Sequence, residues 1–598
     1  MADEIEFLYS GGLENEPSNK ESFLKKLKNL LKKHLKSYLP EERRLKHLPQ
    51  LLSKKERYLI LGLSLVIIFS IIAIPVGYYF NITKDMPDFG GRFSEGMIGE
   101  PRFINPLLLQ TDTDRDLAQL VYSGLLKNDG KGNFVPDLAE AFNISDDGLV
   151  YTFILKKDIR WHNGRIFTAD DIIFTIKTAQ NPDFTSPQRI NWQGVEVVKI
   201  DDYTVEFRLK NPYAQFVNNL TLGILPSHLW QDVRAANFVL SELNLKPVGT
   251  GPYQFSKLRK NKLGRITSYE LTANENYHLE GPYIESIQFK FYSTEEELVQ
   301  SFNLSGVDNL GGISPANLKN LRFPGKLEIK KLKIPRYFAV FFNQNQSDVL
   351  SDKNVRLALA HSVNKDKIIE SLDGNGLKVN SPILPEIFSD FNTNIKIYDY
   401  NPNFAKQILE NSEWQDKDGD QVREKGGRKL EIDFVVPLRK ELIEVGGLLK
   451  KDWEEIGMRI NLINVPVIEL QQNYIQPRNY EMLLFGEVLN VEPDPFSFWH
   501  SSQKKDPGLN LALYDNQGAD KLLEEARQTL NPITRASKYN DFQNLVIEDL
   551  PSVFLYSPTY IYPQTKKING FKEDLLGLPS ERFVNIHQWY IKTERVRK

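Results

Sequence analysis

The chain has 598 residues, more than one hydrophobic core usually organises, so its length predicts two or three packed units. Hydrophobic residues make up 41% and charged residues 26%, which is ordinary for a globular protein and excludes the disordered, collagen-like and multi-span membrane classes. The absence of cysteine excludes disulfides, thiolate nucleophiles and cysteine-ligated zinc or iron–sulfur sites. The net charge of −3 conceals a strongly basic stretch near the N-terminus.

This basic stretch holds thirteen Lys and Arg residues and four Glu residues between Lys20 and Arg57. Hydrophobic residues recur in it at three- and four-residue spacing, namely at Phe23, Leu27, Leu30, Leu31, Leu35 and Tyr38. The spacing predicts a basic amphipathic segment within residues 1–57. Such a segment either adsorbs to the anionic inner leaflet or is solvated and only enforces topology, and both interpretations stay open. Nucleic-acid binding is not indicated, because it needs basic residues spread over a folded surface.

Residues 58–80 contain no charged side chain and predict one transmembrane helix. At 1.5 Å per residue this helix covers about 34 Å, enough to cross a bilayer. The preceding SKKER is basic and the following NITKDMPD is balanced, so the positive-inside rule places the N-terminus in the cytoplasm and the remainder in the extracellular or periplasmic space. An uncleaved signal anchor fits better than a cleaved signal peptide, whose apolar stretch is shorter and precedes a small-residue cleavage site.

Beyond a linker at residues 81–94, strand patterns alternate with helix patterns. Residues 149–155 and 203–209 alternate apolar and polar side chains, which is typical of half-buried strands. Thr168 and Asp171 predict a capping box at the start of a helix. The mixture predicts the α/β class.

Two further helices are expected in the second half of the chain. Residues 354–363 show helical spacing after two capping residues, and residues 439–456 form an amphipathic pattern that stops at Gly457. We find no tandem repeat of solenoid or propeller length.

Catalytic and phosphate-binding motifs are missing from the sequence. There is no G-x-x-x-x-G-K-[ST], no H-E-x-x-H and no G-x-S-x-G, and the eight histidines are scattered singly. We therefore expect a protein that is not an enzyme, with no catalytic residues and no cofactor.

One acidic loop resembles a calcium site. Asp416, Asp418, Asp420 and Glu424 occupy alternate positions in DKDGDQVRE. An EF-hand loop beginning at Asp416 needs glycine at position six and glutamate at position twelve, where this chain has Gln421 and Gly427. A calcium site and a solvated turn both stay open.

Seven ordered segments resemble the family 5 extracellular solute-binding proteins, which include the oligopeptide-, dipeptide- and nickel-binding receptors of ATP-binding-cassette (ABC) importers. They begin with GEPRFINPLL, LVYSGLLKND and FVPDLAEAFNISDDGLVYTFILKKDIRWHNGRIFTADDIIFT. Further along come VGTGPYQF, NENYHLEGPYIESIQF, FFNQNQSDVLSDKNVRLALAHSVNKDKII and EPDPFSFWHSS. Together they span nearly all of residues 95–595.

The resemblance implies a two-lobed periplasmic-binding-protein-like receptor of type II, in the large peptide-receptor class, with an extra subdomain and two crossing segments as a hinge. Lobe I is expected at residues 95–345 with an inserted subdomain at about 123–246, lobe II at 346–556, and a return to lobe I at 557–598. Solute binds between the lobes and stabilises the closed form through contacts made with both.

In this family a peptide lies extended and pairs its backbone with protein segments from either lobe, which is strand addition inside a cleft. The resemblance assigns these two segments to Gln110, Thr111 and Asp112, and to Gly486, Glu487 and Val488. Further ligand contacts are expected at Trp192, Tyr337, Asn490, Glu492, Asp494 and Trp499.

The chain departs from the family where charge is recognised. Asn490 stands where peptide receptors usually present an aspartate to the ligand's amine, so Glu487, Glu492 or Asp494 would have to replace that counter-ion. Glu441 and Leu484 stand where one peptide receptor binds the far carboxylate. A separate run, GTGP at residues 249–252, predicts either a hinge turn or a ligand contact.

The leading function is a monomeric, membrane-anchored receptor that captures peptides or peptide-like solutes and delivers them to the permease and ATPase subunits of an ABC importer. A first alternative keeps the fold and changes the solute to a metal chelate, an opine or an oligosaccharide. A second alternative is a cell-surface hydrolase whose cleft carboxylates act as acid and base.

Overall fold

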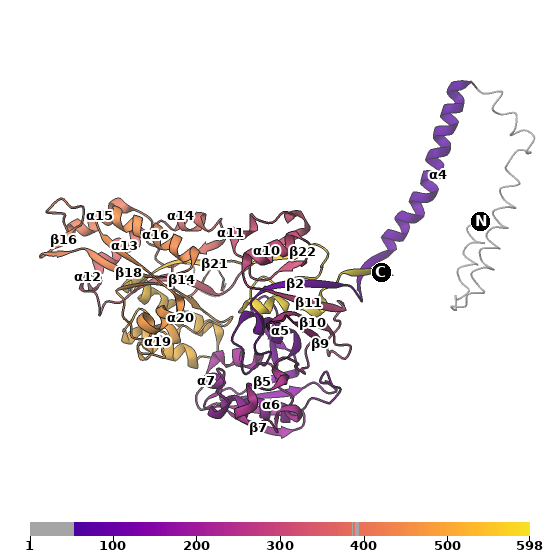
Figure 1. Cartoon of the computed structure of the whole chain (residues 1–598), viewed down its shortest axis with the longest axis horizontal. Coiled ribbons are helices and arrows are strands. Elements are labelled where there is room, and N and C mark those ends of the chain that lie inside the picture. Colours follow the sequence, from indigo (N-terminus) through magenta and orange to yellow (C-terminus); the bar gives the residue numbers. More distant parts are fainter. Residues whose placement is uncertain (1–52, 386, 389–393) are drawn as a thin grey trace, which may run out of the picture. The chain divides into compact units, whose positions relative to one another are not determined.

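The computed structural model in Figure 1 describes residues 53–385, 387–388 and 394–598. Nearly all of the predicted basic amphipathic segment lies outside the described residues. Contacts divide the chain into one unit of residues 1–86 with Arg595–Lys598, and a second unit of Pro87–Glu594.

The first unit contains helix α4 (Lys54–Ile82), which includes all of the predicted transmembrane helix. Ser53 caps it reciprocally: the Ser53 backbone N–H donates to the Glu56 carboxylate at 2.8 Å, and the Glu56 N–H donates to Ser53 Oγ at 3.4 Å. The most apolar part of α4 has a mean hydropathy of 2.9 and contains no buried residue. The helix is therefore long and apolar enough to cross a bilayer.

The first unit also holds residues 83–86 of β1 (Thr83–Asp88) and residues 595–597 of β23 (Lys592–Arg597), two strands that pair with each other. Arg595 Nε lies 2.9 Å from Asp85 Oδ1, so an ion pair joins the two strands.

The first sheet of the second unit, in lobe I, has the order β12-β2-β11-β10-β9. Strand β2 runs parallel to both β11 and β12, whereas β10 is antiparallel to β9 and β11. The strands are β2 (Arg92–Ile98), β9 (Tyr253–Lys260), β10 (Ile266–Ala273), β11 (Ser286–Tyr292) and β12 (Asn309–Leu310).

A four-stranded antiparallel sheet is inserted between β2 and β9. The predicted strands and capping box are confirmed here: β6 and β8 form, and the Thr168 N–H donates to the Asp171 carboxylate at 3.1 Å at the start of α6. The elements are β5 (Ala139–Ile144), β6 (Val150–Leu155), β7 (Glu196–Asp201), β8 (Thr204–Arg208) and α6 (Ala169–Gln180).

Lobe II contains a six-stranded mixed sheet of order β15-β21-β14-β20-β18-β19. Helices α13 and α16, both predicted, lie on one face of it, and α19 and α20 lie on the other (Figure 1). The strands are β14 (Arg336–Phe342), β15 (Gly376–Lys378), β18 (Glu431–Pro437), β19 (Arg459–Val465), β20 (Met482–Val488) and β21 (Ser552–Pro558). The helices are α13 (Lys353–Ser362), α16 (Lys440–Glu455), α19 (Gln517–Gln528) and α20 (Pro532–Asp549).

The chain passes between the lobes at two short segments. Strand β13 (Leu327–Leu332) pairs with β22 (Tyr560–Thr565), while β14 and β21 belong to the lobe II sheet. The crossings therefore lie at residues 333–335 and at Thr559. These observations confirm the predicted two-lobed α/β fold with an extra subdomain, whereas the predicted lobe boundaries stay predictions.

Shorter elements connect these sheets. They are α5 (Asp112–Val121), β3 (Leu126–Asn128), β4 (Phe134–Pro136), α7 (Arg189–Trp192), η2 (Ala214–Thr221), α8 (Ser227–Trp230), α9 (Ala235–Phe238), α10 (Glu295–Asn303), α11 (Pro315–Leu318) and α12 (Asp348–Ser351). Lobe II adds α14 (Lys365–Ser371), α15 (Pro402–Asn411), β16 (Glu424–Lys425), β17 (Arg428–Lys429), α17 (Val467–Glu469) and α18 (Phe496–Trp499), and η7 (Pro579–Phe583) follows in lobe I.

The GTGP run does not form a hinge. A Cβ atom on Gly249 would lie 1.8 Å from the Val121 carbonyl oxygen, so this close approach within lobe I requires glycine. The His162 ring accepts the Gly249 N–H at 3.1 Å and lies 3.1 Å from the Gly251 carbonyl oxygen. The hinge interpretation is wrong, because the crossings between the sheets occur elsewhere.

A buried arginine ties the two ends of lobe I together. Arg582 Nη2 lies 2.5 Å from Asp116 Oδ2 and 3.2 Å from Glu95 Oε1, and Tyr562 donates to Glu95 at 2.9 Å. Burial raises the pKa of Glu95 to about 7, although the Arg582 charge opposes the rise.

We predict that Glu95→Gln flattens the pH dependence of stability between pH 4.5 and about 7. In the unfolded chain Glu95 loses its proton near pH 4.5, whereas in the folded chain it holds the proton up to about 7. Wild-type stability therefore falls as pH rises through this window, by up to about 3 kcal/mol, and glutamine has no proton to lose. Urea unfolding of the detergent-solubilised chain measures the slope. The exposed Glu275→Gln should keep the wild-type slope, and an unchanged slope in Glu95→Gln would contradict the prediction.

Candidate functional site

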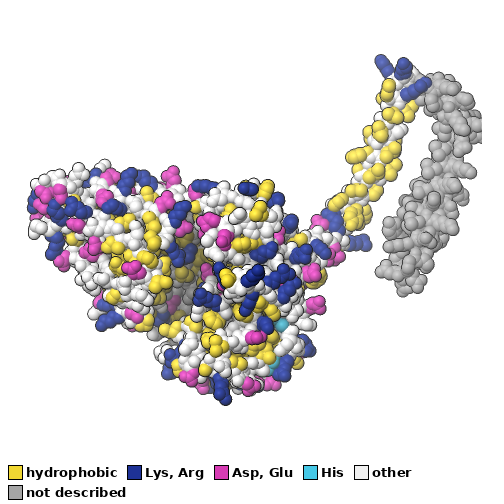
Figure 2. All heavy atoms as spheres, in the orientation of Figure 1, with side chains coloured by type: hydrophobic (Ala, Val, Ile, Leu, Met, Phe, Trp, Pro, Cys, Tyr) yellow, Lys and Arg dark blue, Asp and Glu magenta, His cyan; other side chains and the backbone are white. Residues whose placement is uncertain are grey.

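A cavity of about 1100 Å³ lies between the two lobes of the second unit. Lobe I, the inserted subdomain and lobe II all contribute to its walls, through residues such as Tyr122, Tyr213 and Asp494. Figure 2 shows the groove between the lobes. A solute held here would touch both lobes at once, which is the contact that closure requires.

Three of the predicted ligand contacts line this cavity: Val488, Asn490 and Asp494. Val488 ends strand β20 and is 44% exposed. Because Asn490 is neutral, Asp494 is the one predicted contact lining the cavity that carries a charge.

The Asp494 carboxylate is already paired. Arg527 on α19 donates to it from Nε at 3.0 Å and from Nη2 at 2.6 Å, and the Tyr213 hydroxyl donates at 3.0 Å. The guanidinium carbon of Arg527 also lies 3.8 Å from the centre of the Phe496 ring. An ammonium group at Asp494 would compete with this bidentate arginine.

Glu492 is engaged in the same way. Arg535 Nη2 lies 2.6 Å from Glu492 Oε1, and Asn218 of the inserted subdomain donates to the Glu492 carbonyl at 3.4 Å. Nearby, Gln215 donates to the Tyr539 hydroxyl at 2.7 Å. Hydrogen bonds thus join η2 of the inserted subdomain to lobe II beside the cavity.

Glu487, Tyr337 and Trp499 lie together in the lobe II core. The Tyr337 hydroxyl donates to Glu487 Oε2 and accepts from Trp499 Nε1 at 3.3 Å. Glu487 is 2% exposed, and its Oε1 has no hydrogen-bond partner among the described residues. Burial raises the pKa of Glu487 well above its usual value, although the Tyr337 hydrogen bond opposes the rise.

Two other predicted contacts, Trp192 and Gly486, are not among the residues that line the cavity. Trp192 is 2% exposed in the core of the inserted subdomain, where its ring centre lies 5.7 Å from that of Phe216. Gly486 pairs with Phe338 across the sheet.

The lobe I segment stands at the start of α5. Thr111 caps the helix, its side chain accepting the Asp114 N–H at 3.1 Å. Asp112 pairs with Arg115 at 3.2 Å, and Gln110 donates its N–H to Asp114 at 3.3 Å. Arg115 lines the cavity, so this segment borders it.

Sequence reasoning missed Arg527, Arg535 and Tyr213. Arg527 lies 33 residues from the aspartate that it pairs with, and Tyr213 lies 281 residues away. No spacing rule reports such pairs, because residues this far apart in the sequence meet only in the tertiary fold.

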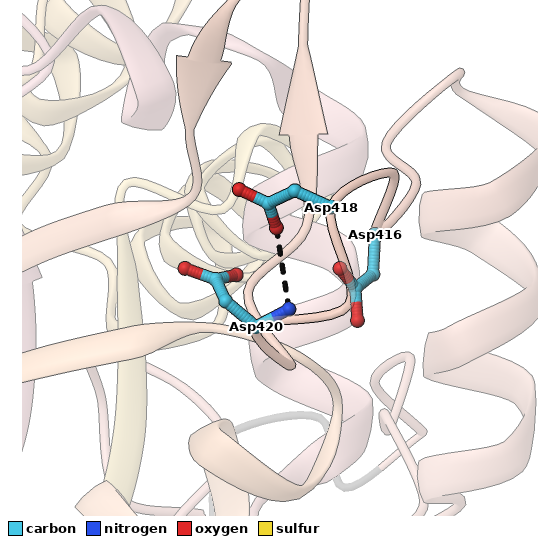
Figure 3. Close-up of side chains that lie close together, drawn as sticks. All are labelled: Asp416, Asp418 and Asp420. Carbon is cyan, nitrogen blue, oxygen red and sulfur yellow. Dashed lines mark hydrogen bonds between the residues drawn. The ribbon is translucent and has the colours of Figure 1, made fainter.

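Three carboxylates of the acidic loop gather around one turn, as Figure 3 shows for Asp416, Asp418 and Asp420. Lys429 Nζ bonds to both Asp418 and Asp420, and Arg459 lies 3.1 Å from Asp420. The Lys429 hydrogen bond lowers the pKa of Asp420 to about 2.

Glu424 lies outside this group: it pairs with Lys429 in the β16–β17 hairpin, and its carbonyl accepts the Gln415 N–H at 3.1 Å. The protein's own cations therefore pair with two of the three gathered carboxylates, Asp418 and Asp420, and a calcium site stays a prediction.

Comparison with known proteins agrees with this geometry. A family model described as bacterial extracellular solute-binding proteins, family 5 Middle, matches residues 133–510. The oligopeptide-binding protein AppA of Bacillus subtilis (strain 168) is 28% identical over 513 residues, which covers 84% of this chain and 92% of that protein.

Solved structures match over a similar length. A structure of AppA from Bacillus subtilis in complex with a nonapeptide gives a TM-score of 0.68 at 27% identity, covering 85% of this chain and 100% of that one. A structure of NikZ from Campylobacter jejuni in complex with Ni(L-His) gives 0.69 at 28% identity, covering 83% and 99%.

We predict that millimolar calcium leaves the melting temperature of the wild-type chain unchanged. Calcium has to displace Lys429 and Arg459 from the loop, whereas Lys429→Gln removes one competing charge and should allow an upward shift of about 2 °C. Differential scanning calorimetry with calcium or EDTA measures the shift. Lys319→Gln, which removes an exposed ion pair elsewhere, should behave as wild type. A calcium shift of equal size in wild type and Lys429→Gln would contradict the prediction.

Proposed function

Because this chain belongs to family 5 of the bacterial extracellular solute-binding proteins, we propose that it captures a peptide or peptide-like solute between its lobes and delivers it to an ABC import permease. The cavity of about 1100 Å³ between the lobes carries the proposal. Its volume lies just above the range of ordinary ligand sites, which is about 300–1,000 Å³. A solute larger than a single amino acid therefore fits.

The capture step follows from the two crossings. Residues 333–335 and Thr559 are short, so the lobes can rotate about them while each sheet stays intact. A solute that contacts both lobes lowers the free energy of the closed form relative to the open form. A permease that contacts both lobes can distinguish these two forms, and no bond has to be broken.

Anchoring is proposed from α4. Its apolar length suits a bilayer, and basic residues precede it while the following segment is balanced, which favours a cytoplasmic N-terminus. A tethered receptor stays near the membrane in which its permease lies. The second unit would then work outside the cytoplasm as a monomer.

Peptide is the first choice of solute. The two segments that the family uses to pair with a peptide backbone correspond here to the start of α5 and to the end of β20, where Val488 lines the cavity. The relative from Bacillus subtilis, 27% identical, was solved with a nonapeptide.

A non-peptide solute is the second candidate, and one observation favours it. The carboxylates of Asp494 and Glu492 are paired with arginines, and that of Glu487 is buried in the core, so none of these three is a ready counter-ion for a peptide amine. The relative from Campylobacter jejuni, 28% identical, was solved with Ni(L-His).

Mass spectrometry of the solute that co-purifies with the detergent-solubilised chain tests the proposal. We expect peptides, and tryptophan fluorescence should then report saturable binding of a synthetic peptide pool. A bound metal chelate or opine in place of peptides would support the second candidate. Absence of saturable binding for all of these solutes would contradict the receptor function.

We further predict that Glu487→Gln leaves peptide affinity within about twofold of wild type, whereas Asp494→Asn changes it about tenfold or more. Glu487 is buried against Tyr337, whereas Asp494 lines the cavity and holds Arg527. Isothermal titration calorimetry with one cationic peptide measures both variants. A large loss in Glu487→Gln with little change in Asp494→Asn would assign the ligand contact to Glu487 instead.

A further inference from the structure

Arg336, the first residue of β14, is a partly buried cation whose Nε atom is buried. Its Nε has no hydrogen-bond acceptor in the part of the chain that the structure describes, and no ion pair to its guanidinium is found there. Burial lowers the pKa of Arg336, while Tyr556, Asp112 and Glu441 act in the opposite direction. An arginine keeps its charge in proteins, and the buried Nε–H of Arg336 still needs an acceptor.

Strand register places this side chain beside the cleft. Arg336 pairs directly with Val488 in the antiparallel ladder of β14 and β20, and directly opposed residues project from the same face of a sheet. Val488 lines the cavity. The next pair, Tyr337 with Glu487, projects to the opposite face and into the core. The guanidinium therefore lies on the face that carries Val488.

The surroundings of Arg336 come from both lobes. Its guanidinium carbon lies 5.8 Å from the centre of the Phe338 ring, and Arg439 and Glu441 stand at the start of α16 in lobe II. From lobe I, Asp112 acts on its charge, although Asp112 is already paired with Arg115. Arg336 thus pairs with the end of β20 and interacts electrostatically with Asp112 at the start of α5, and these are the two segments expected to hold the solute.

The ion pairs near the cleft also indicate that Arg336 binds an anion. The carboxylates of Asp494 and Glu492 are matched by arginines, whereas no acid among the described residues forms an ion pair with Arg336. An anionic group on the solute would supply the missing acceptor, and a carboxylate fits the planar guanidinium with two parallel hydrogen bonds.

We propose that Arg336 binds a carboxylate of the captured solute and so makes this receptor selective for solutes that carry one. This inference rests on the proposed function and names the solute's charged group. Arg336 also adjoins the crossing at residues 333–335, so the carboxylate would be held where the lobes hinge.

The test compares peptides of one sequence with a free or an amidated C-terminus. Wild type should prefer the free carboxylate, and Arg336→Met should lose roughly tenfold to a hundredfold in affinity for that form and almost nothing for the amidated form. Arg336→Lys, which keeps the charge but not the fork, should recover part of the loss. Equal affinities of wild type for the two forms, or equal losses for both in Arg336→Met, would overturn the proposal.

The melting temperature of the solute-free protein tests independently whether Arg336 has a structural role. Arg356 is the matched control, because its guanidinium donates to the carbonyls of Leu350, Leu550 and Asp549 at 2.7–3.0 Å. Arg356→Met should lower the melting temperature by several degrees, whereas Arg336→Met should leave it unchanged or raise it. A fall in Arg336→Met as large as that in Arg356→Met would show a structural role and overturn the proposal.

Two outcomes separate this inference from its premise. If wild type binds no peptide in either form, the peptide proposal fails, and the melting temperatures still decide whether Arg336 is unpartnered. If Asp112→Asn weakens binding of both peptide forms as much as Arg336→Met does, Arg336 pairs with Asp112 on closure instead, and the carboxylate assignment fails.

Discussion

The cost of burying charge governs how two lobes can enclose one cleft. A charged side chain taken out of water loses several kcal/mol of hydration unless a partner replaces the water. At the cleft wall Arg527 meets this need for Asp494, and next to the wall Arg535 meets it for Glu492. Each ion pair fixes the position of its carboxylate and neutralises its charge, so the carboxylate is less able to pair with a cationic group of the solute. The cleft wall therefore presents a matched acid at Asp494, and Arg336 beside the cleft is a cation without an ion pair among the described residues.

Hydrogen bonds beside these ion pairs couple the inserted subdomain to lobe II. Tyr213 donates to Asp494, and Gln215 donates to Tyr539, so the subdomain contacts lobe II directly as well as through lobe I. Rotation about the crossings has to preserve or exchange these hydrogen bonds. Each exchange costs about 1 kcal/mol, which is within what a bound solute can supply. The contacts made by η2 thus belong to the energetics of closure as much as those of the cavity wall.

Local structure could be predicted from the sequence wherever a short-range rule applies. The α6 capping box depends on residues three apart, and strands β6 and β8 show their alternation directly. Helix α16 ends where Gly457 adopts a positive φ of 91°, as a terminal glycine predicts. The partners of the cleft acids could not be found in this way, because Asp494 and Tyr213 meet only through the tertiary fold.

The alternation of side chains along a strand explains why a family motif identifies the segment that borders the solute but not which of its side chains faces the solute. Within residues 486–488, Val488 lines the cavity while Glu487 enters the core, because successive side chains of a strand point to opposite faces. A sequence motif identifies the segment, but which of two adjacent residues faces the solute depends on the register with β14. That register places Arg336 opposite Val488. A charge recognised by this receptor can thus come from the neighbouring strand, about 150 residues away in the sequence, and not from the motif itself.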